Sequence, residues 1–270
     1  MTTPQGTTTS ATRAADILLL FTDETDSLGV SGIARRLGLS KAVVHRILTT
    51  FVDRGLLVAS GPDREYRLGP AAVALGARAL RSSSLRALAQ PVLADLQRTT
   101  GETATVTALV GDLRIYLAQV ESPNEIKMTV EVGRRFPLYT GSSGRCILAF
   151  QRPELIESTL SADLVALTGE TLTDPRRLRE RLDRIRADGW CASSGERQQG
   201  AASVAAPVFD VDGYAVGALS VCGPAHRMTD EANRAYAAAV VAGAETVSRG
   251  LGWRGGLPDL PTKDIHAPSP

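Results

Sequence analysis

The spacing of apolar residues divides the chain into a helical first third and a mixed remainder. Between residues 12 and 54 apolar side chains recur every three or four positions, a spacing typical of amphipathic helices. Two short runs at 55–59 and 65–68 then predict a β-hairpin, because the residues between them are rich in turn formers. Residues 70–100 return to the helical pattern, with a break predicted near Ser82–Ser84.

Beyond Gly101 strand-like and helix-like segments alternate, which predicts a mixed α/β domain after the helical one. The Thr-rich segment 1–9 and the proline-containing segment 251–270 are predicted to be disordered tails. The predicted strands are 103–110, 114–120, 125–132, 201–209 and 214–222, and the predicted helices are 143–150, 153–160, 175–188 and 229–249.

The segment 31–48 carries the pattern of a helix-turn-helix. Such a motif needs a small residue where two helices cross, which Ala34 supplies, and a turn residue four positions later that tolerates positive φ, which Gly38 supplies. Ser40 can cap the second helix, and Val44 provides a β-branched core residue ten positions after the alanine. The hairpin that follows would form a wing.

One face of the second helix is polar and cationic and includes short side chains, as a helix entering the major groove requires. Residues 30–69 contain seven lysines and arginines against three acidic residues. An ordinary three-helix unit or a protein-binding winged helix would share this fold, and His45 could be a neutral surface histidine, but the basic face favours DNA. The predicted DNA-binding residues are Ser40, Lys41, Ala42, His45, Arg46 and Thr49 on the helix and Arg64 and Arg67 on the wing.

Composition narrows the class of protein further. The net charge over 270 residues is only +1, so the chain is no general polyanion binder. It has no apolar run of about 18 residues and no visible secretory signal, and we expect a cytoplasmic protein with no membrane partner. Its three cysteines and three histidines lack metal-ligand spacing, and no P-loop or GxGxxG motif is present, so neither metal nor cofactor is expected.

Several separated motifs carry a resemblance to one known family: Ala-Asp-Ile-Leu (15–18), Ile-Ala-Arg-Arg-Leu-Gly-Leu-Ser-Lys (33–41), Val-His-Arg-Ile-Leu (44–48), Arg-Gly-Leu (54–56), Tyr-Arg-Leu-Gly (66–69), Ala-Ala-Pro-Val-Phe (205–209) and Ala-Leu-Ser-Val-Cys-Gly-Pro (218–224). With them the sequence resembles the IclR family of bacterial transcriptional regulators over most of residues 12–250. The resemblance implies an α+β, multidomain fold: a winged helix-turn-helix at 10–69, a linker helix at 70–84 and a GAF-like effector-binding domain at 85–250. It also implies homodimers or homotetramers that repress or activate operons in response to a small-molecule effector.

The segment Gly141–Gly144 precedes an apolar helix, where backbone amides could hold a carboxylate, although Ser142 or Ser143 could equally be a plain cap. The resemblance implies an effector pocket lined by this loop and by residues on late strands. Relatives that bind small keto acids carry Asp where Ser193 stands, Cys where Ser203 stands and Ser where Cys222 stands, so glyoxylate- or pyruvate-like effectors do not follow. We expect a small organic acid or an aromatic metabolite. The predicted effector-binding residues are Gly141, Ser142, Ser143, Ser193, Ser203, Ser220 and Cys222.

No catalytic residues are predicted. Gly141–Gly144 is not a GxSxG elbow, and Cys146 has no base nearby in the sequence, so a buried structural thiol is the favoured interpretation. An enzyme with an accessory winged helix is therefore disfavoured. Glu196 is predicted to anchor its loop, and Met128, Leu138 and Tyr139 could wall the pocket or pack in the core.

Overall fold

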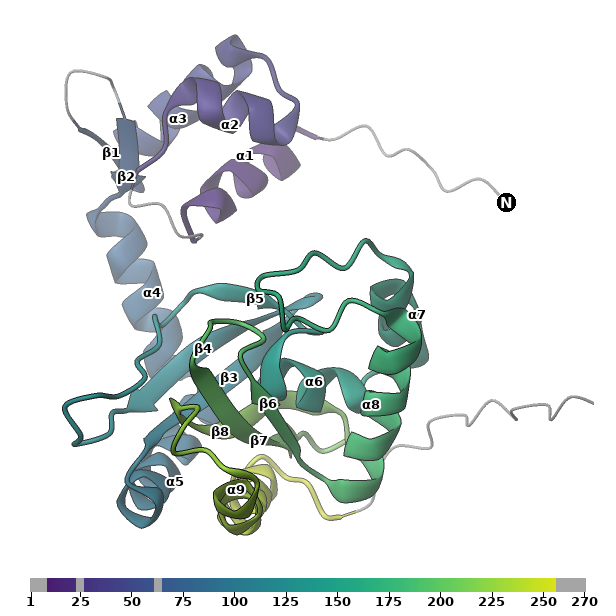
Figure 1. The fold of residues 1–270 in the computed structure, drawn as a ribbon. Helices are drawn as coiled ribbons and strands as arrows, with labels where there is room; N and C mark the ends of the chain where they lie inside the picture. The colour runs from purple at the N-terminus through teal and green to yellow at the C-terminus, as the bar shows by residue number, and fades with distance from the viewer. Residues whose placement is uncertain (1–8, 23–26, 61–64, 256–270) are drawn as a thin grey trace, which may run out of the picture. The chain divides into compact units, whose positions relative to one another are not determined.

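The computed structural model describes residues 9–22, 27–60 and 65–255, and these residues form two compact units that divide between Ser83 and Ser84. Each unit is described by itself (Figure 1). No helix in the described part of the chain is long and apolar enough to cross a membrane.

The first unit is a three-helix bundle with a two-stranded wing. Its core joins the helices to the wing through side chains such as Ile17, Val44, Leu48 and Tyr66. Leu28 adds a single bridge to Tyr66 and extends the hairpin. The elements are α1 (Ser10–Leu19), the 3-10 turn η1 (Leu20–Thr22), α2 (Val30–Leu37), α3 (Lys41–Asp53), β1 (Leu57–Ser60), β2 (Glu65–Leu68) and α4 (Pro70–Ser82).

The turn between α2 and α3 has the predicted geometry. Gly38 ends α2 with φ of 63°, a left-handed conformation that favours glycine. The Ser40 hydroxyl accepts a hydrogen bond from the Val43 amide at 3.3 Å and so caps α3. Ala34 and Val44 are buried where the helices cross. The helix-turn-helix prediction is confirmed at each of these positions.

The second unit is a six-stranded sheet with helices on both faces (Figure 1). The strand order is β5-β4-β3-β8-β7-β6, and every neighbouring pair is antiparallel. The elements are α5 (Ser84–Thr100), β3 (Thr103–Val110), β4 (Leu113–Val120), β5 (Arg135–Pro137), α6 (Gly141–Ala149), α7 (Pro153–Ser161), α8 (Pro175–Asp188), β6 (Cys191–Ser194), β7 (Ala201–Phe209), β8 (Ala215–Pro224) and α9 (Asp230–Gly250).

Alternation along β7 and β8 separates the two faces of this sheet. Val204 packs in a cluster with Ala237 of α9, whereas its neighbours Ser203 and Ala205 face α6, where they contact Ser142 and Cys146. Helices α5 and α9 therefore cover one face, and α6 and α8 cover the other (Figure 1). On the second face α6 is buried along its whole length, in a hydrophobic core formed with α8 and the sheet.

One strand prediction is wrong, and two short strands were not predicted. Residues 125–132 alternate like a strand but form none, because side chains instead of a neighbouring strand bond their backbone: Thr103 donates to the Met128 carbonyl, and Gln119 accepts from the Val130 amide. The strand that follows β4 in the sheet is β5, three residues long. The short strand β6 was missed because its sequence, Cys-Ala-Ser-Ser, carries no apolar alternation.

The predicted tails were also too long. Thr9 caps α1 by accepting a hydrogen bond from the Thr12 amide, and Trp253 stacks on Phe209 with ring centroids 5.1 Å apart. Both residues therefore belong to the folded units. Residues 1–8 and 256–270 lie outside the described residues.

Candidate functional site

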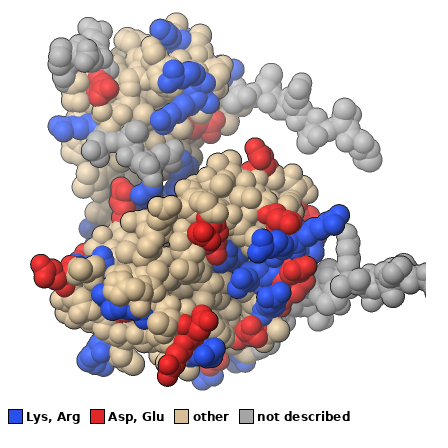
Figure 2. Space-filling view, in the orientation of Figure 1, with Lys and Arg blue, Asp and Glu red and all other residues tan. Residues whose placement is uncertain are grey.

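The outer face of α3 is fully accessible. Lys41, Ala42, His45, Arg46 and Thr49 are all exposed, while Val44 and Leu48 on the opposite face are buried. Among the described residues, neither Lys41 nor Arg46 forms an ion pair with a carboxylate. Their charges are therefore available to another molecule, and Figure 2 shows basic side chains exposed on this unit.

Two hydroxyls on this face already bond to the helix. Thr49 donates to the His45 carbonyl at 3.0 Å, and Thr50 donates to the Arg46 carbonyl at 3.1 Å. Because each hydroxyl has a single hydrogen, these threonines can only accept from a further partner. Ser40 differs from these threonines, because its oxygen accepts the capping bond and its hydrogen remains available to a further partner.

The wing contributes one described arginine. Arg67 is exposed on β2, opposite Val58 of β1. Arg64, the other arginine predicted to contact DNA, lies outside the described residues. Both α3 and β2 therefore carry exposed basic side chains.

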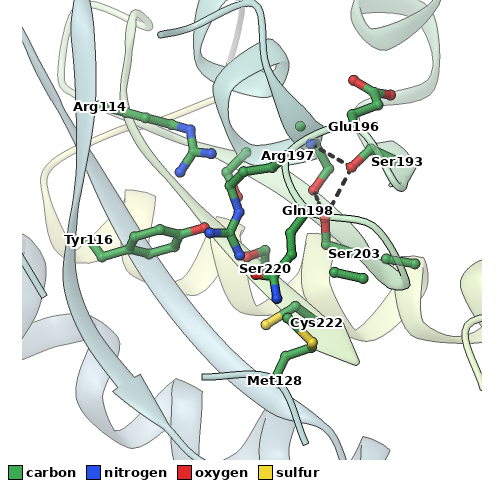
Figure 3. Close-up of a pocket in the computed structure, with 15 residues that line it drawn as sticks. Arg114, Tyr116, Met128, Ser193, Glu196, Arg197, Gln198, Ser203, Ser220 and Cys222 are labelled. Atoms are coloured by element: carbon green, nitrogen blue, oxygen red, sulfur yellow. Dashed lines mark hydrogen bonds between the residues drawn. The ribbon is translucent and has the colours of Figure 1, made fainter. Parts of the chain in front are cut away.

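The second unit contains a narrow cavity between the start of α6 and the sheet (Figure 3). About 30 Å³ of it is open to the centre of a water molecule, roughly twice what one water needs. The structure brings together around it every residue predicted to bind the effector: Gly141, Ser142, Ser143, Ser193, Ser203, Ser220 and Cys222. Met128 also lines the cavity, whereas Leu138 and Tyr139 belong to the hydrophobic core.

Serine hydroxyls form the polar side of the cavity. The Ser142 hydroxyl lies 2.7 Å from that of Ser203, which lies 3.2 Å from that of Ser193, and the Ser142 amide donates to Ser193 at 3.1 Å. Ser220 pairs separately with Thr105 at 2.7 Å. The Ser142 amide at the start of α6 therefore bonds to a side chain of β6, and Ser142 does not cap the helix on which it lies.

Two arginines that the sequence analysis did not select also line the cavity. Arg114 of β4 is 1% exposed, and its Nε and Nη1 atoms have no hydrogen-bond partner among the described residues. Its guanidinium carbon lies 5.1 Å from the Tyr116 ring centroid and 5.0 Å from that of Phe136. Arg197 approaches the same two rings, at 5.9 and 5.1 Å.

A signal for Arg114 was present in the sequence. Within β4, Arg114 and Tyr116 share one face, before the irregularity that shifts the register of the strand, and Tyr116 is an aromatic residue suited to burial. A charged residue in such an inward-facing series is unusual unless it serves a partner. Arg197 offers no comparable signal, because it lies in a polar loop.

Glycine permits the close approach of α6 to Arg114. A β-carbon at Gly144 would lie 2.5 Å from the Leu138 carbonyl oxygen and 3.1 Å from Arg114 Nε. Gly141 has φ of 69°, a conformation that L side chains rarely adopt. These two positions set the distance between the helix start and the buried guanidinium.

Beneath the cavity, an ion pair connects α6 to the loop after β6. Arg145 is buried, and both of its terminal nitrogens bond to the two carboxylate oxygens of Glu196. Burial opposes the charge of Arg145, but Cys191 and Glu196 more than compensate and raise its pKa. Glu196 thus holds its loop in place, as the sequence predicted.

The cysteines differ in protonation. Burial raises the pKa of Cys146 well above its ordinary value, and its sulfur lies 3.2 Å from the Ala205 carbonyl oxygen. A hydrogen bond from Cys146, together with the charge of Arg145, lowers the pKa of Cys191 to about 6 despite its burial. Burial raises the pKa of Cys222 to about 12, so this cavity-lining thiol is neutral at pH 7.

A helix-turn-helix with an exposed basic face, followed by a separate α+β unit with an internal cavity, is typical of DNA-binding transcriptional regulators. Residues 10–61 match the IclR helix-turn-helix domain, and residues 77–249 match the bacterial transcriptional regulator IclR C-terminal family. The chain therefore belongs to the IclR family of transcriptional regulators, which bind DNA through their helix-turn-helix.

Individual relatives agree with this assignment. The transcriptional regulator BhcR of Paracoccus denitrificans is 36% identical over 90% of this chain and 87% of its own length. The crystal structure of an IclR transcriptional regulator from Silicibacter sp. TM1040 has a TM-score of 0.83, 30% identity and covers 94% of this chain and all of its own. An IclR homologue from Microbacterium hydrocarbonoxydans, complexed with 4-hydroxybenzoate, has a TM-score of 0.70, is 26% identical and covers 90% of this chain and 99% of its own. Such relatives are DNA-binding regulators and not enzymes.

Proposed function

We propose that this chain is a one-component regulator whose affinity for operator DNA changes when a small organic acid enters the cavity of the second unit. The observation that carries the proposal is the buried Arg114 guanidinium, which presents two unpaired nitrogens beside that cavity. A carboxylate is the natural partner of such a group, because its two oxygens match the planar guanidinium.

The proposed DNA contacts are made by α3 in the major groove and by the wing on the backbone. The exposed cations Lys41 and Arg46 and the short side chains between them support this docking. The contact residues are Ser40, Lys41, Ala42, His45, Arg46 and Thr49, with Arg67 and Arg64 on the wing.

The proposed effector is short. Only about 30 Å³ is open in the cavity, which favours an acid of a few heavy atoms over an aromatic ring. The homologue from Microbacterium hydrocarbonoxydans is complexed with an aromatic acid, which supports a carboxylate-containing effector but not its size. Contacts would come from Gly141, Ser142 and Ser143 at the start of α6 and from Ser193, Ser203, Ser220 and Cys222 on the strands.

The proposed active form is a homodimer or a homotetramer. One short recognition helix reads too few base pairs for a genomic site, so two copies must act together. Helix α4 supports this view, because it buries no residue within the chain and leaves Val73 and Leu75 67% and 63% exposed. Light scattering after gel filtration would give the number of copies.

Mobility-shift assays with the promoter next to this protein's gene test the proposed DNA binding. The double variant Lys41→Ala, Arg46→Ala should lose specific retardation while keeping its thermal stability, because both side chains are exposed. Arg176→Ala, an exposed arginine on α8, is the matched control and should bind as the wild type does. No specific retardation of wild type below about 1 μM at moderate salt would point to a protein-binding winged helix instead.

Thermal-shift measurements with short carboxylates test the proposed binding of the effector. An acid that raises the melting temperature of the full chain should also change retardation of the promoter fragment. An acid that stabilises the protein but leaves DNA affinity unchanged would contradict the coupling between the two units.

A further inference from the structure

The cavity carries more positive charge than one carboxylate can neutralise. Arg114 and Arg197 both line it, and Glu196 is the acidic residue among its described lining residues. Glu196, however, gives both carboxylate oxygens to Arg145. In Figure 3 its carboxylate lies apart from the two guanidinium groups. The two positive charges therefore have no counter-charge within the cavity.

Both guanidinium groups lie near the same two aromatic rings. Their central carbons lie 5.0 and 5.1 Å from the centroid of the same ring, Phe136, and 5.1 and 5.9 Å from that of Tyr116. Aromatic faces hold both cations in place without neutralising them. No ion pair with a carboxylate is found for either arginine in the described part of the chain.

The two arginines differ in their surroundings. Arg114 is almost completely buried, and its Nε and Nη1 atoms have no hydrogen-bond partner among the described residues. Arg197 is only partly buried and comes from the loop that follows β6. An anionic group on Arg114 would sit deep in the cavity, and a second one on Arg197 would sit nearer the loop.

We propose that the cavity selects a short dicarboxylate, with one carboxylate on Arg114 and the second on Arg197. This proposal rests on the proposed function of the cavity as the effector site. The proposal adds that the site recognises two negative charges on the effector and that Arg197 binds the second carboxylate. The Ser142, Ser193 and Ser203 hydroxyls lie beside the same space, and because their two mutual hydrogen bonds use two of their three hydrogens, one hydrogen is left for a carboxylate oxygen.

Isothermal titration of the full chain with matched pairs of ligands tests the proposal. The dianions oxalate, malonate and succinate are each compared with their monoamides oxamate, malonamate and succinamate, which have nearly the same size but a single charge. At least one dianion should bind about tenfold or more tightly than its monoamide, because a second charge-assisted contact is made.

Variants assign the charges to the two arginines. Arg197→Gln should reduce the affinity for the favoured dianion to that of its monoamide and leave the monoamide affinity within about twofold. Arg114→Gln should weaken both ligands, provided that its circular dichroism and melting curve are those of a folded protein. Arg176→Gln, an exposed arginine on α8, should change neither affinity.

Three outcomes would overturn the proposal: equal affinity for each dianion and its monoamide, absence of binding by all three dianions, or tighter binding of inorganic phosphate than of any dicarboxylate. If the monoamides or other short monocarboxylates bind and alter DNA retardation, the proposed function stands and only the selection of a dianion fails. If no short acid binds at all, the proposed function fails as well.

Discussion

The buried guanidinium of Arg145 holds both carboxylate oxygens of Glu196, which is 51 residues away in the sequence. The exposed fractions of the two side chains are 0% and 12%. This pair connects α6, whose start lines the cavity, to the loop that carries Arg197. It fixes the position of one cavity arginine relative to the helix.

Removing one partner of this pair should destabilise the second unit strongly. We expect Glu196→Gln to lower the free energy of unfolding by about 3–5 kcal/mol, because it leaves the buried charge of Arg145 uncompensated. Urea denaturation followed by circular dichroism would measure the loss. Asp95→Asn, which breaks the exposed pair of Asp95 with Arg98, should cost less than about 1 kcal/mol. Equal losses in the two variants would contradict this view of the buried pair.

Ser40 allows the stability of the recognition helix to be separated from DNA binding. Ser40→Ala should cost about 1 kcal/mol by removing the cap of α3. Ser40→Asp keeps a capping oxygen and should retain the melting temperature, but its negative charge should weaken DNA binding several-fold, most at low salt. Melting curves and mobility shifts measure the two effects. Undiminished DNA binding by Ser40→Asp would place this residue away from the phosphates.

Two helical glycines should respond in opposite directions to alanine. At Gly144 the new β-carbon would lie 2.5 Å from the Leu138 carbonyl oxygen, so we expect Gly144→Ala to cost about 1–3 kcal/mol. A β-carbon added at Gly76 of α4 would have no atom within 4 Å apart from the backbone of its own helix. Gly76→Ala should therefore stabilise the chain by about 0.5–1 kcal/mol. Denaturant midpoints give both values. A neutral Gly144→Ala would show that α6 can move away from Leu138 and Arg114.

The lowered pKa of Cys191 makes stability depend on pH. Its pKa is about 6 in the folded chain against an ordinary value of 9.0, so between these values the unfolded chain binds a proton that the folded chain does not. Stability should therefore rise from pH 6 to pH 9 and be lost as the pH falls through 6. Melting temperatures across this range should show a flatter profile for Cys191→Ala.

Cys222→Ala is the matched control for that profile. Burial raises the pKa of Cys222 to about 12, so its thiol stays protonated in the folded chain from pH 6 to pH 9. Its removal should shift all melting temperatures alike and leave the slope unchanged. A slope that persists in Cys191→Ala would assign the pH dependence to other groups.

The sequence by itself determined the helix-turn-helix. Ala34, Gly38, Ser40 and Val44 act through steric fit, backbone conformation and capping between residues close in the chain, and such local preferences are visible in a pattern of spacing. The same holds for the paired strands around Gly111 and Gly213, where turn residues separate apolar runs. The resemblance to the IclR family predicted the serines of the cavity but not the two arginines that make the cavity positively charged.

Only the tertiary structure showed that the cavity is positively charged. Arg114 and Arg197 lie in different segments, and neither spacing nor composition shows that both approach the Phe136 ring. The segment outside residues 30–69 is slightly acidic as a whole, yet its cavity is cationic, because Glu196 is taken up by Arg145. Which charges neutralise each other depends on contacts between distant parts of the chain, and these follow from the packing of helices on the sheet.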